Sequence, residues 1–269
     1  MRPKGFLREA ITATQREIAR ARQHISETTL RSDAEQSPPG PPLTEALEGA
    51  TPQAPGIIAE IKRSCPVRGV LHPNLDPAAL AQDCQKAGAK AVSVVTDATY
   101  FKGSIKDLEM VGDGVDIPLV RRDFILSAYQ IFEAKRAGAS AIFLITGFLS
   151  PSQQKDYTSL IRELGMEPLV EIASEWEFEQ AYQSGAKIVG INNQDLATLE
   201  MDSQRAPRVA AIFPKEIIPL AISGISNRKI IEANLDHGIL NFLVGQPLIQ
   251  AQDPTTTLHY LRTGKMPNE

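Results

Sequence analysis

The chain has 269 residues, and its 28 Lys and Arg against 32 Asp and Glu give a formal net charge of −4. A chain of this length can bury a large core in one domain or in two smaller ones. The charge balance excludes the broad positive field that attracts nucleic acid, so we expect no nucleic-acid partner.

Cysteine and histidine are sparse in this sequence. Cys65 and Cys84 cannot build a disulfide framework, and the four histidines show no metal-ligand spacing. We therefore expect no metal and a reducing, cytoplasmic environment. No apolar run approaches the roughly 18–20 residues of a membrane span. The first ten residues also lack the apolar core of a signal peptide, so we expect no membrane partner.

The first predicted element is an amphipathic helix from Leu7 to about His24, where apolar residues recur at helical spacing between charged ones. Two proline-rich stretches, SPPGPP and TPQAPG, then flank a short helical turn in LTEALEGA. We interpret residues 1–55 as a helical extension with a proline-rich connector, and residues 56–269 as the main domain.

From Gly56 onward the chain alternates short apolar runs with helical segments. Several helices end in glycine followed by alanine, as in CQKAGAKAVSVV, where glycine suits a left-handed C-cap before the next strand. Continuous apolar strands between helices are typical of a parallel sheet buried on both faces. The number of units predicts a (β/α)8 barrel, and no Gly-x-Gly-x-x-Gly follows the first run. The predicted strands are IIAEI (57–61), AVSVV (91–95), PLV (118–120), AIFLI (141–145), PLVEI (168–172), IVGI (188–191), IIPLAI (217–222) and NFLV (241–244).

Polar residues at the carboxyl ends of these strands are the candidates for chemistry, because active sites of such barrels lie there. Glu60 and Lys62 lie two apart and so face the same side of the first strand, as a structural ion pair or as groups for acid–base work. Of Arg121 and Arg122, alternation allows only one to point into the mouth. Glu171 is acidic within an apolar run, where it is either functional or the buried cap of a neighbouring loop.

Glycines follow the last two strands, in SGISN (223–227) and VGQPL (244–248). Phosphate sites in these barrels are built from the loops after strands seven and eight, so we expect a phosphorylated small-molecule substrate. The alternative is that Gly224 and Gly245 only make tight turns. Cys65 is a possible nucleophile, but without a nearby histidine in sequence a small loop residue is the preferred interpretation.

The following blocks stand in order along the chain: IIAEIKRSCPVRG, VVTDATYFKGSIKDL, IPLVRRDFILSAYQI, LVEI, IVGINNQDLATLEMD and FLVGQPLI. They resemble the indole-3-glycerol phosphate synthase family, and the N-terminal helix and LTEAL connector are similar to its N-terminal extension. The resemblance implies closure of an indole ring on 1-(2-carboxyphenylamino)-1-deoxyribulose 5-phosphate, with loss of CO2 and water and no cofactor. In the family, a lysine acts as general acid on the sugar carbonyl, and glutamates at the ends of strands one and five manage later proton transfers.

Many of the family's functional positions are retained, but the general acid is not. Arg122 stands where the family has its lysine, and a guanidinium with a pKa above about 12 is a poor proton donor. Lys62 is then the candidate replacement acid. Ile222 replaces a family glutamate, and Val67 a loop serine. The resemblance implies catalytic roles at Glu60, Lys62, Arg122, Glu171 and Asn192, and substrate or phosphate binding at Cys65, Gln194, Ser223, Gly224, Gly245 and Gln246, of which Cys65, Gln194 and Gln246 depart from the family pattern.

Three hypotheses follow from this mixture. The chain is an indole-3-glycerol phosphate synthase with an altered site, a related enzyme acting on another phosphorylated substrate, or a non-catalytic protein that binds a phosphorylated ligand. We expect a monomer or homodimer, since the N-terminal helix can cover its own barrel or that of a second copy.

Overall fold

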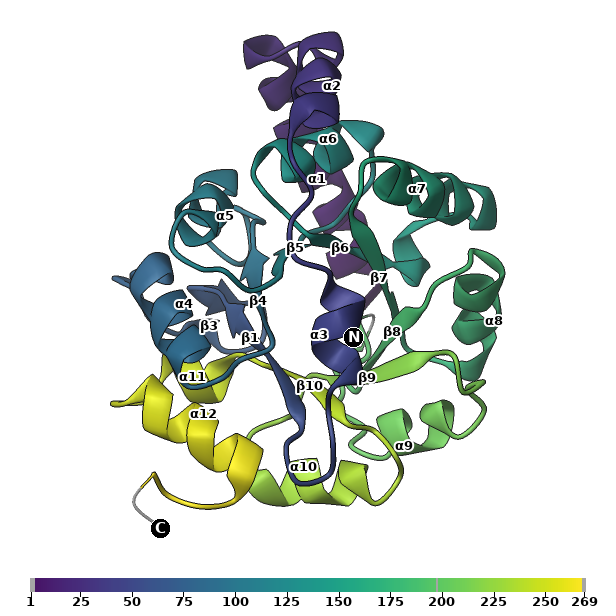
Figure 1. Cartoon of the computed structure of the whole chain (residues 1–269). Helices are drawn as coiled ribbons and strands as arrows, with labels where there is room; N and C mark the ends of the chain where they lie inside the picture. The colour runs from purple at the N-terminus through teal and green to yellow at the C-terminus, as the bar shows by residue number, and fades with distance from the viewer. Residues whose placement is uncertain (1–2, 197, 268–269) are drawn as a thin grey trace.

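The computed structural model describes residues 3–196 and 198–267 and contains a closed barrel of parallel strands (Figure 1). The strands neighbour one another in the order β1-β10-β9-β8-β7-β6-β5-β4. Every predicted strand is present, so the (β/α)8 prediction is confirmed. The barrel strands are β1 (Gly56–Ile61), β4 (Ala91–Val95), β5 (Leu119–Arg122), β6 (Ala141–Ile145), β7 (Glu167–Ile172), β8 (Ile188–Asn192), β9 (Ile218–Ile222) and β10 (Asn241–Val244).

Helices surround the barrel, and most begin at a side-chain cap that the sequence provides. Ser104, Ser127 and Ser174 each accept a hydrogen bond from a backbone N–H of the first helical turn. Gly138 lies at the end of one such helix with φ of 84°, as the glycine–alanine stops predict. The surrounding helices are α4 (Pro77–Lys86), α5 (Ile105–Gly112), α6 (Ala128–Arg136), α7 (Pro151–Glu163), α8 (Glu175–Gln183), α9 (Arg205–Ala210), α10 (Arg228–Leu235), α11 (Gln246–Ile249) and α12 (Pro254–Thr263), with a 3-10 turn η1 (Thr146–Phe148).

The N-terminal segment contributes three helices at different places. The predicted first helix is α1 (Pro3–His24), and the turn between the proline-rich stretches is α3 (Leu43–Glu48). Helix α2 (Glu27–Gln36) was not predicted, because only two of its residues, Leu30 and Ala34, are buried and its periodicity is weak. The division into residues 1–55 and 56–269 as separate units stays a prediction.

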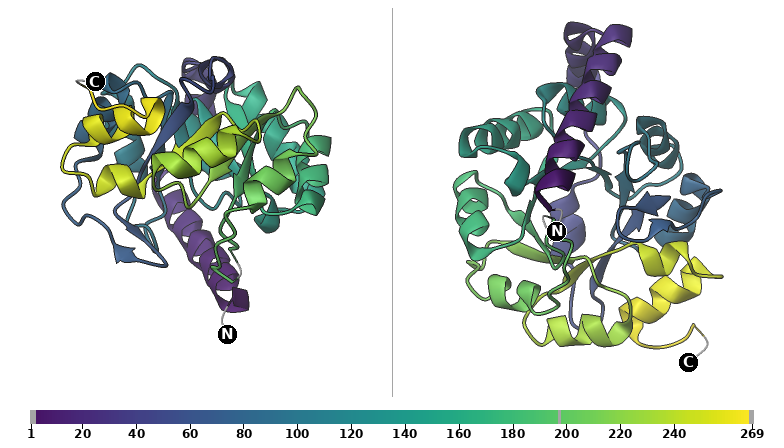
Figure 2. Two further views of the ribbon diagram at one scale, coloured as in Figure 1. Left: turned by 90° about the horizontal axis from the view of Figure 1, so that it is seen from below. Right: turned by 180° about the vertical axis from the view of Figure 1, so that it is seen from behind.

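The two ends of the barrel are covered differently. Leu43 and Leu47 of α3 are buried against residues of the barrel interior and close its amino-terminal end. At the opposite end, α1 runs from the edge of the barrel towards its centre when the molecule is seen from behind (Figure 2), and Ala10 packs against Phe124 and Ile145 there. The mouth under α1 is the end at which the strands finish. A small hairpin of β2 (Ser64–Cys65) and β3 (Gly69–Val70) follows β1 at this end.

The core has two layers, as a barrel buried on both faces requires. One layer lies between the sheet and the outer helices, and the other fills the interior of the barrel, where Phe143, Ile222 and Leu243 are buried in one cluster. Among the described helices, none is long and apolar enough to cross a membrane.

Candidate active site

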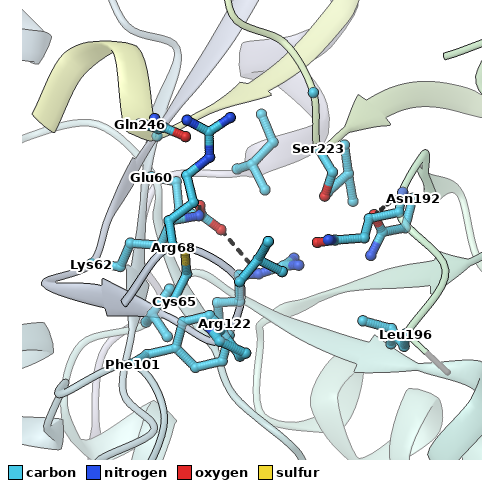
Figure 3. Close-up of a pocket in the computed structure, with 18 of the residues that line it drawn as sticks. Glu60, Lys62, Cys65, Arg68, Phe101, Arg122, Asn192, Leu196, Ser223 and Gln246 are labelled. Carbon is cyan, nitrogen blue, oxygen red and sulfur yellow. Dashed lines mark hydrogen bonds and ion pairs between the residues drawn. The ribbon is translucent and has the colours of Figure 1, made fainter. Parts of the chain in front are cut away.

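A cavity of about 360 Å³ opens at the carboxyl ends of the strands (Figure 3). Because the strands are parallel, residues far apart in sequence meet at this edge. All of the predicted site residues line this one cavity: Glu60, Lys62, Cys65, Arg122, Glu171, Asn192, Gln194, Ser223, Gly224, Gly245 and Gln246. Their roles stay predictions, but their convergence is a fact of the structure.

Arg122 lies between two carboxylates at the base of the cavity. Its Nε is 3.0 Å from Oε1 of Glu60, and its Nη1 is 2.9 Å from Oε2 of Glu171. The second pair is at ion-pair distance without hydrogen-bond alignment. The guanidinium carbon also lies 4.4 Å from the centre of the Phe143 ring, within the range of a cation–π contact. Arg122 is therefore held on three sides.

The electrostatics of this cluster keep Arg122 charged. Burial works against the charge, but Glu171 and Glu60 outweigh it and raise the pKa of Arg122 above its already high ordinary value. An arginine in this setting can bind an anion but cannot release a proton at neutral pH.

Glu60 is shared between Arg122 and Lys62. The ammonium of Lys62 donates a hydrogen bond to Oε2 of Glu60, while Arg122 contacts the other oxygen. Burial opposes ionisation of Glu60, but the two cations overcome this and hold the pKa of its carboxyl below the ordinary value. Glu60 is thus a carboxylate, and Lys62 is held beside it at the cavity wall.

Glu171 and Asn192 form the facing side of the site. Asn192 Nδ2 donates to Oε1 of Glu171 at 2.7 Å, and the backbone N–H of Gln194 donates to Oδ1 of Asn192 at 3.0 Å. The side-chain amide of Gln194 donates to the carbonyl of Leu199 at 3.1 Å. Gln194 therefore braces its own loop and adds no charge to the cavity.

Ile222 gives this wall an apolar character. It is buried in the barrel interior and packs so closely on Gly190 that a Cβ at residue 190 would collide with its Cδ1. The glycine of IVGI thus makes room for this isoleucine. Other apolar side chains continue the lining at Phe101, Phe124, Ile145, Leu196, Leu199, Met201, Ile225 and Leu243.

The two glycine loops lie on the same rim. Ser223 and Gly224 have φ of 65° and 75°, a left-handed turn that fits glycine well and is rare for serine. A Cβ at Gly245 would lie 2.7 Å from Oε2 of Glu60, so this position needs glycine for close approach. Both glycines thus have a structural reason, and phosphate binding at these loops stays a prediction.

The structure separates the two neighbouring arginines as strand alternation predicts. Arg121 does not line the cavity, and its guanidinium donates to Asp123 Oδ2 at 3.0 Å and to the carbonyl of Gln130 at 2.8 Å. It also lies 2.8 Å from Glu133. Arg121 is therefore a buried structural cation, and Arg122 belongs to the site.

Cys65 lies in the β2–β3 hairpin, partly buried. No histidine lines the cavity in the described part of the chain, so no imidazole base reaches it there. The interpretation as a small loop residue fits this placement.

The cavity also contains residues that the sequence analysis did not select, among them Arg68, Asp97 and Phe101. Asp97 follows the end of β4, so the strand-end rule applies to it as well. Arg68 and Phe101 are placed by loops, whose course the sequence pattern did not define.

Comparisons with known proteins agree with this geometry. The family model described as indole-3-glycerol phosphate synthase matches residues 7–261. The indole-3-glycerol phosphate synthase of Desulfosudis oleivorans is 41% identical over 256 residues, covering 95% of each chain. That of Syntrophobacter fumaroxidans is 38% identical, covering 95% of this chain and 97% of the relative.

Solved structures show the same fold at low identity. Thiamine phosphate pyrophosphorylase from Pyrococcus furiosus superposes with a TM-score of 0.59 at 14% identity, covering 78% of this chain and 94% of that one. The N-acetylmannosamine-6-phosphate 2-epimerase of Clostridium perfringens gives a TM-score of 0.57 at 14% identity, covering 71% of this chain and 86% of that one. The barrel, the convergent strand-end residues and the match along nearly the whole chain lead to one conclusion: the chain belongs to the indole-3-glycerol phosphate synthase family.

Proposed function

We propose that this chain is a carboxy-lyase of tryptophan biosynthesis that converts 1-(2-carboxyphenylamino)-1-deoxyribulose 5-phosphate to indole-3-glycerol phosphate. The observation that carries the proposal is the convergence of Glu60, Lys62, Glu171 and Asn192 on one cavity of a barrel from this family. No cofactor is required for the chemistry.

The reaction makes three demands on the site. The aromatic carbon that bears the carboxylate adds to the sugar carbonyl carbon, and the carbonyl oxygen takes up a proton. Release of CO2 returns the bonding electrons to the ring. The new hydroxyl then leaves as water with a second proton, and a base removes a proton from the adjacent carbon to complete the indole. Two protons are donated and one is removed, so one proton is consumed as the carboxylate departs as CO2.

Lys62 is the residue to protonate the carbonyl oxygen. Arg122 holds its charge between Glu60 and Glu171 and cannot act as an acid. Lys62 is the one lysine among the described residues that line the cavity, and Glu60 fixes its ammonium at the wall. Arg122 remains useful as a fixed positive charge that stabilises the developing oxyanion.

Glu171 is the residue to remove the final proton. It is buried, with Asn192 fixing one of its oxygens and Arg122 lying beside the other. The apolar lining around Phe101 and Leu196 accommodates the phenyl ring.

The remaining residues of the cavity bind the rest of the substrate. Cys65 and Gln194, which both line the cavity, contact the substrate. The phosphate lies on the rim formed by Ser223, Gly224, Gly245 and Gln246. The protein works in the cytoplasm as a monomer or homodimer, without nucleic-acid partners.

A second candidate has its own support in the same cavity. Arg122 forms ion pairs with both Glu60 and Glu171, and Ile222 is apolar where the resemblance implies a glutamate. These two residues favour a related protein that binds another phosphorylated compound, with different turnover or none.

The experiment mixes purified protein with the carboxyphenylamino substrate and follows indole fluorescence, beside Arg122→Lys and Arg122→Lys/Ile222→Glu variants. We expect turnover by the native protein. Turnover by the restored variants alone would overturn the proposal and support the second candidate. In parallel, the melting temperature is measured with the substrate and with inorganic phosphate, using chloride at equal ionic strength as control. No rise with either ligand would contradict the phosphate rim.

A further inference from the structure

The loop after β4 carries a carboxyl group that the mechanism above does not use. Asp97 lines the cavity and is 1% exposed. Its Oδ1 accepts hydrogen bonds from the backbone N–H groups of Tyr100 at 2.6 Å and Phe101 at 2.9 Å. Its Oδ2 is buried and has no hydrogen-bond partner in the described residues. One oxygen therefore holds the loop while the other is left unsatisfied.

An unsatisfied buried carboxylate oxygen is costly, so its presence needs a physical reason. A bound ligand that supplies the missing hydrogen-bond partner is one such reason. A carboxyl that is protonated part of the time is another, because the proton lowers the cost of burial. The two reasons are compatible, since a protonated carboxyl that lines the cavity can donate a hydrogen bond or a proton to a ligand there.

The surroundings of Asp97 favour its protonated form. Burial raises the pKa of Asp97 to about 6, against the two backbone N–H groups that lower it. The negative charges of Asp123, just after β5, and Glu17 of α1 raise the pKa of Asp97 further. Tyr100, on the same loop as Asp97, is another titratable group nearby. Arg121 neutralises Asp123 in part, since the two are hydrogen-bonded. Glu17 accepts a hydrogen bond from Thr99 at 2.8 Å, which holds it over this loop.

Asp97 and the proposed first acid, Lys62, follow neighbouring strands of the barrel. Strands β1 and β4 are neighbours in the barrel, with Ile61 opposite Val94. Lys62 follows directly after Ile61, and Asp97 lies three residues beyond Val94. The oxygen that takes the first proton as a carbonyl is the same oxygen that later leaves as water. Two acids on neighbouring strand ends can serve that one atom in turn.

We propose that Asp97 is a further catalytic residue, which donates the second proton from Oδ2 to the departing hydroxyl. This inference rests on the proposed function. The C–O bond breaks, its electron pair leaves with the oxygen, and the proton from Asp97 completes the water molecule. Asp97 is protonated again before the next turnover, after the product has left the cavity, and Glu171 takes the proton from the adjacent carbon.

Asp97→Asn separates catalysis from loop support. Asparagine keeps an oxygen that can accept from Tyr100 and Phe101, but it has no proton to donate. We expect the variant to melt no lower than the native protein while kcat falls by about 100-fold or more, the usual effect of losing a general acid. The native kcat should decline above about pH 6, and this decline should be absent in Asp97→Asn.

Glu17→Gln supplies a test that a merely structural role would not pass. It removes one negative charge that faces Asp97 without touching the cavity wall. We expect the decline in kcat to move to lower pH in this variant, because Asp97 then ionises more easily. If the native protein is active and Asp97→Asn has the same kcat and pH profile, the catalytic role of Asp97 is overturned while the proposed function stands. A native protein that does not form the indole would overturn the proposed function, and the role of Asp97 with it.

Discussion

At the residue scale, the position of Arg122 explains how the site tolerates an arginine. Two buried carboxylates face each other across the barrel mouth, and one guanidinium reaches both. A buried charge that loses its partner is strongly destabilising, whereas an exchange that keeps the charge preserves part of the pairing. Arginine thus balances the charge of the cluster, and it is a poorer proton donor than the lysine that the family resemblance implies at this position.

This arrangement predicts a difference between two substitutions of Arg122. Arg122→Met leaves Glu60 and Glu171 without their shared cation and should lower the free energy of unfolding by about 3–5 kcal/mol. Arg122→Lys keeps the charge and should cost clearly less. Urea unfolding of both variants measures the difference, and equal losses would contradict the shared-cation role.

The raised pKa of Asp97 predicts that the difference in stability between the native protein and Asp97→Asn changes with pH. Its pKa is raised to about 6 in the folded protein, against about 3.9 in the unfolded chain. The unfolded chain therefore ionises first, and the native protein loses stability relative to Asp97→Asn as the pH rises from about 4 to 6. The loss should reach about 3 kcal/mol at most and stay constant above about pH 6. Unfolding curves of both proteins across this range test it, and a pH-independent difference would contradict the raised pKa.

The sequence was sufficient to predict many of the residues that line the cavity, but not which of them contact one another. Strand alternation predicted that only one of Arg121 and Arg122 enters the cavity, because period two is a local property. The bridge from Arg122 to Glu171 spans the barrel and depends on side-chain reach, which no local pattern contains. The strand-end rule also covers Asp97, two residues after β4, but its unsatisfied oxygen becomes apparent only when burial is known.

At the element scale, the barrel strands were predictable because each is a short apolar run that ends at a helix signal. The sequence was less informative for elements that bury few side chains. Helix α2 buries only Leu30 and Ala34 and carries little periodicity, yet it packs against α6 in the fold. Tertiary contact thus decides an element that pattern alone does not.

The contact between β8 and β9 gives a prediction at this scale. Gly190→Ala should destabilise the protein by about 1–3 kcal/mol, because its Cβ meets Cδ1 of Ile222. Ile222→Val removes that methyl group and should cost about 0.5–1.5 kcal/mol alone. The double variant should lose less than the sum of the two. Additive losses from denaturant curves would show that the two residues do not compete for the same space.

At the scale of the whole molecule, the N-terminal segment covers both ends of the barrel. Helix α3 closes the amino-terminal end, while α1 reaches over part of the mouth at the other end (Figure 2). In barrels of this type the amino-terminal end serves stability and the carboxyl ends of the strands carry the active site. The candidate site of this chain lies at the carboxyl ends. The sequence predicted both helices, but their placement at opposite ends follows from contacts far apart in the chain.

The relocation of the proton donor from position 122 to Lys62 is the central claim about this molecule. The measurement that tests it most directly is the rate of indole-3-glycerol phosphate formation by the native protein and by Lys62→Met, Arg122→Lys and the variant that carries both substitutions. Lys86→Met is the control, since this exposed lysine of α4 pairs with Asp83 outside the cavity.

We predict an active native protein, an unchanged control and a fall in kcat of about 100-fold or more in Lys62→Met. The loss should be smaller when Lys62→Met is made in the Arg122→Lys background, because that background restores a second ammonium that can donate a proton. A Lys62→Met protein that retains native turnover would contradict the relocation.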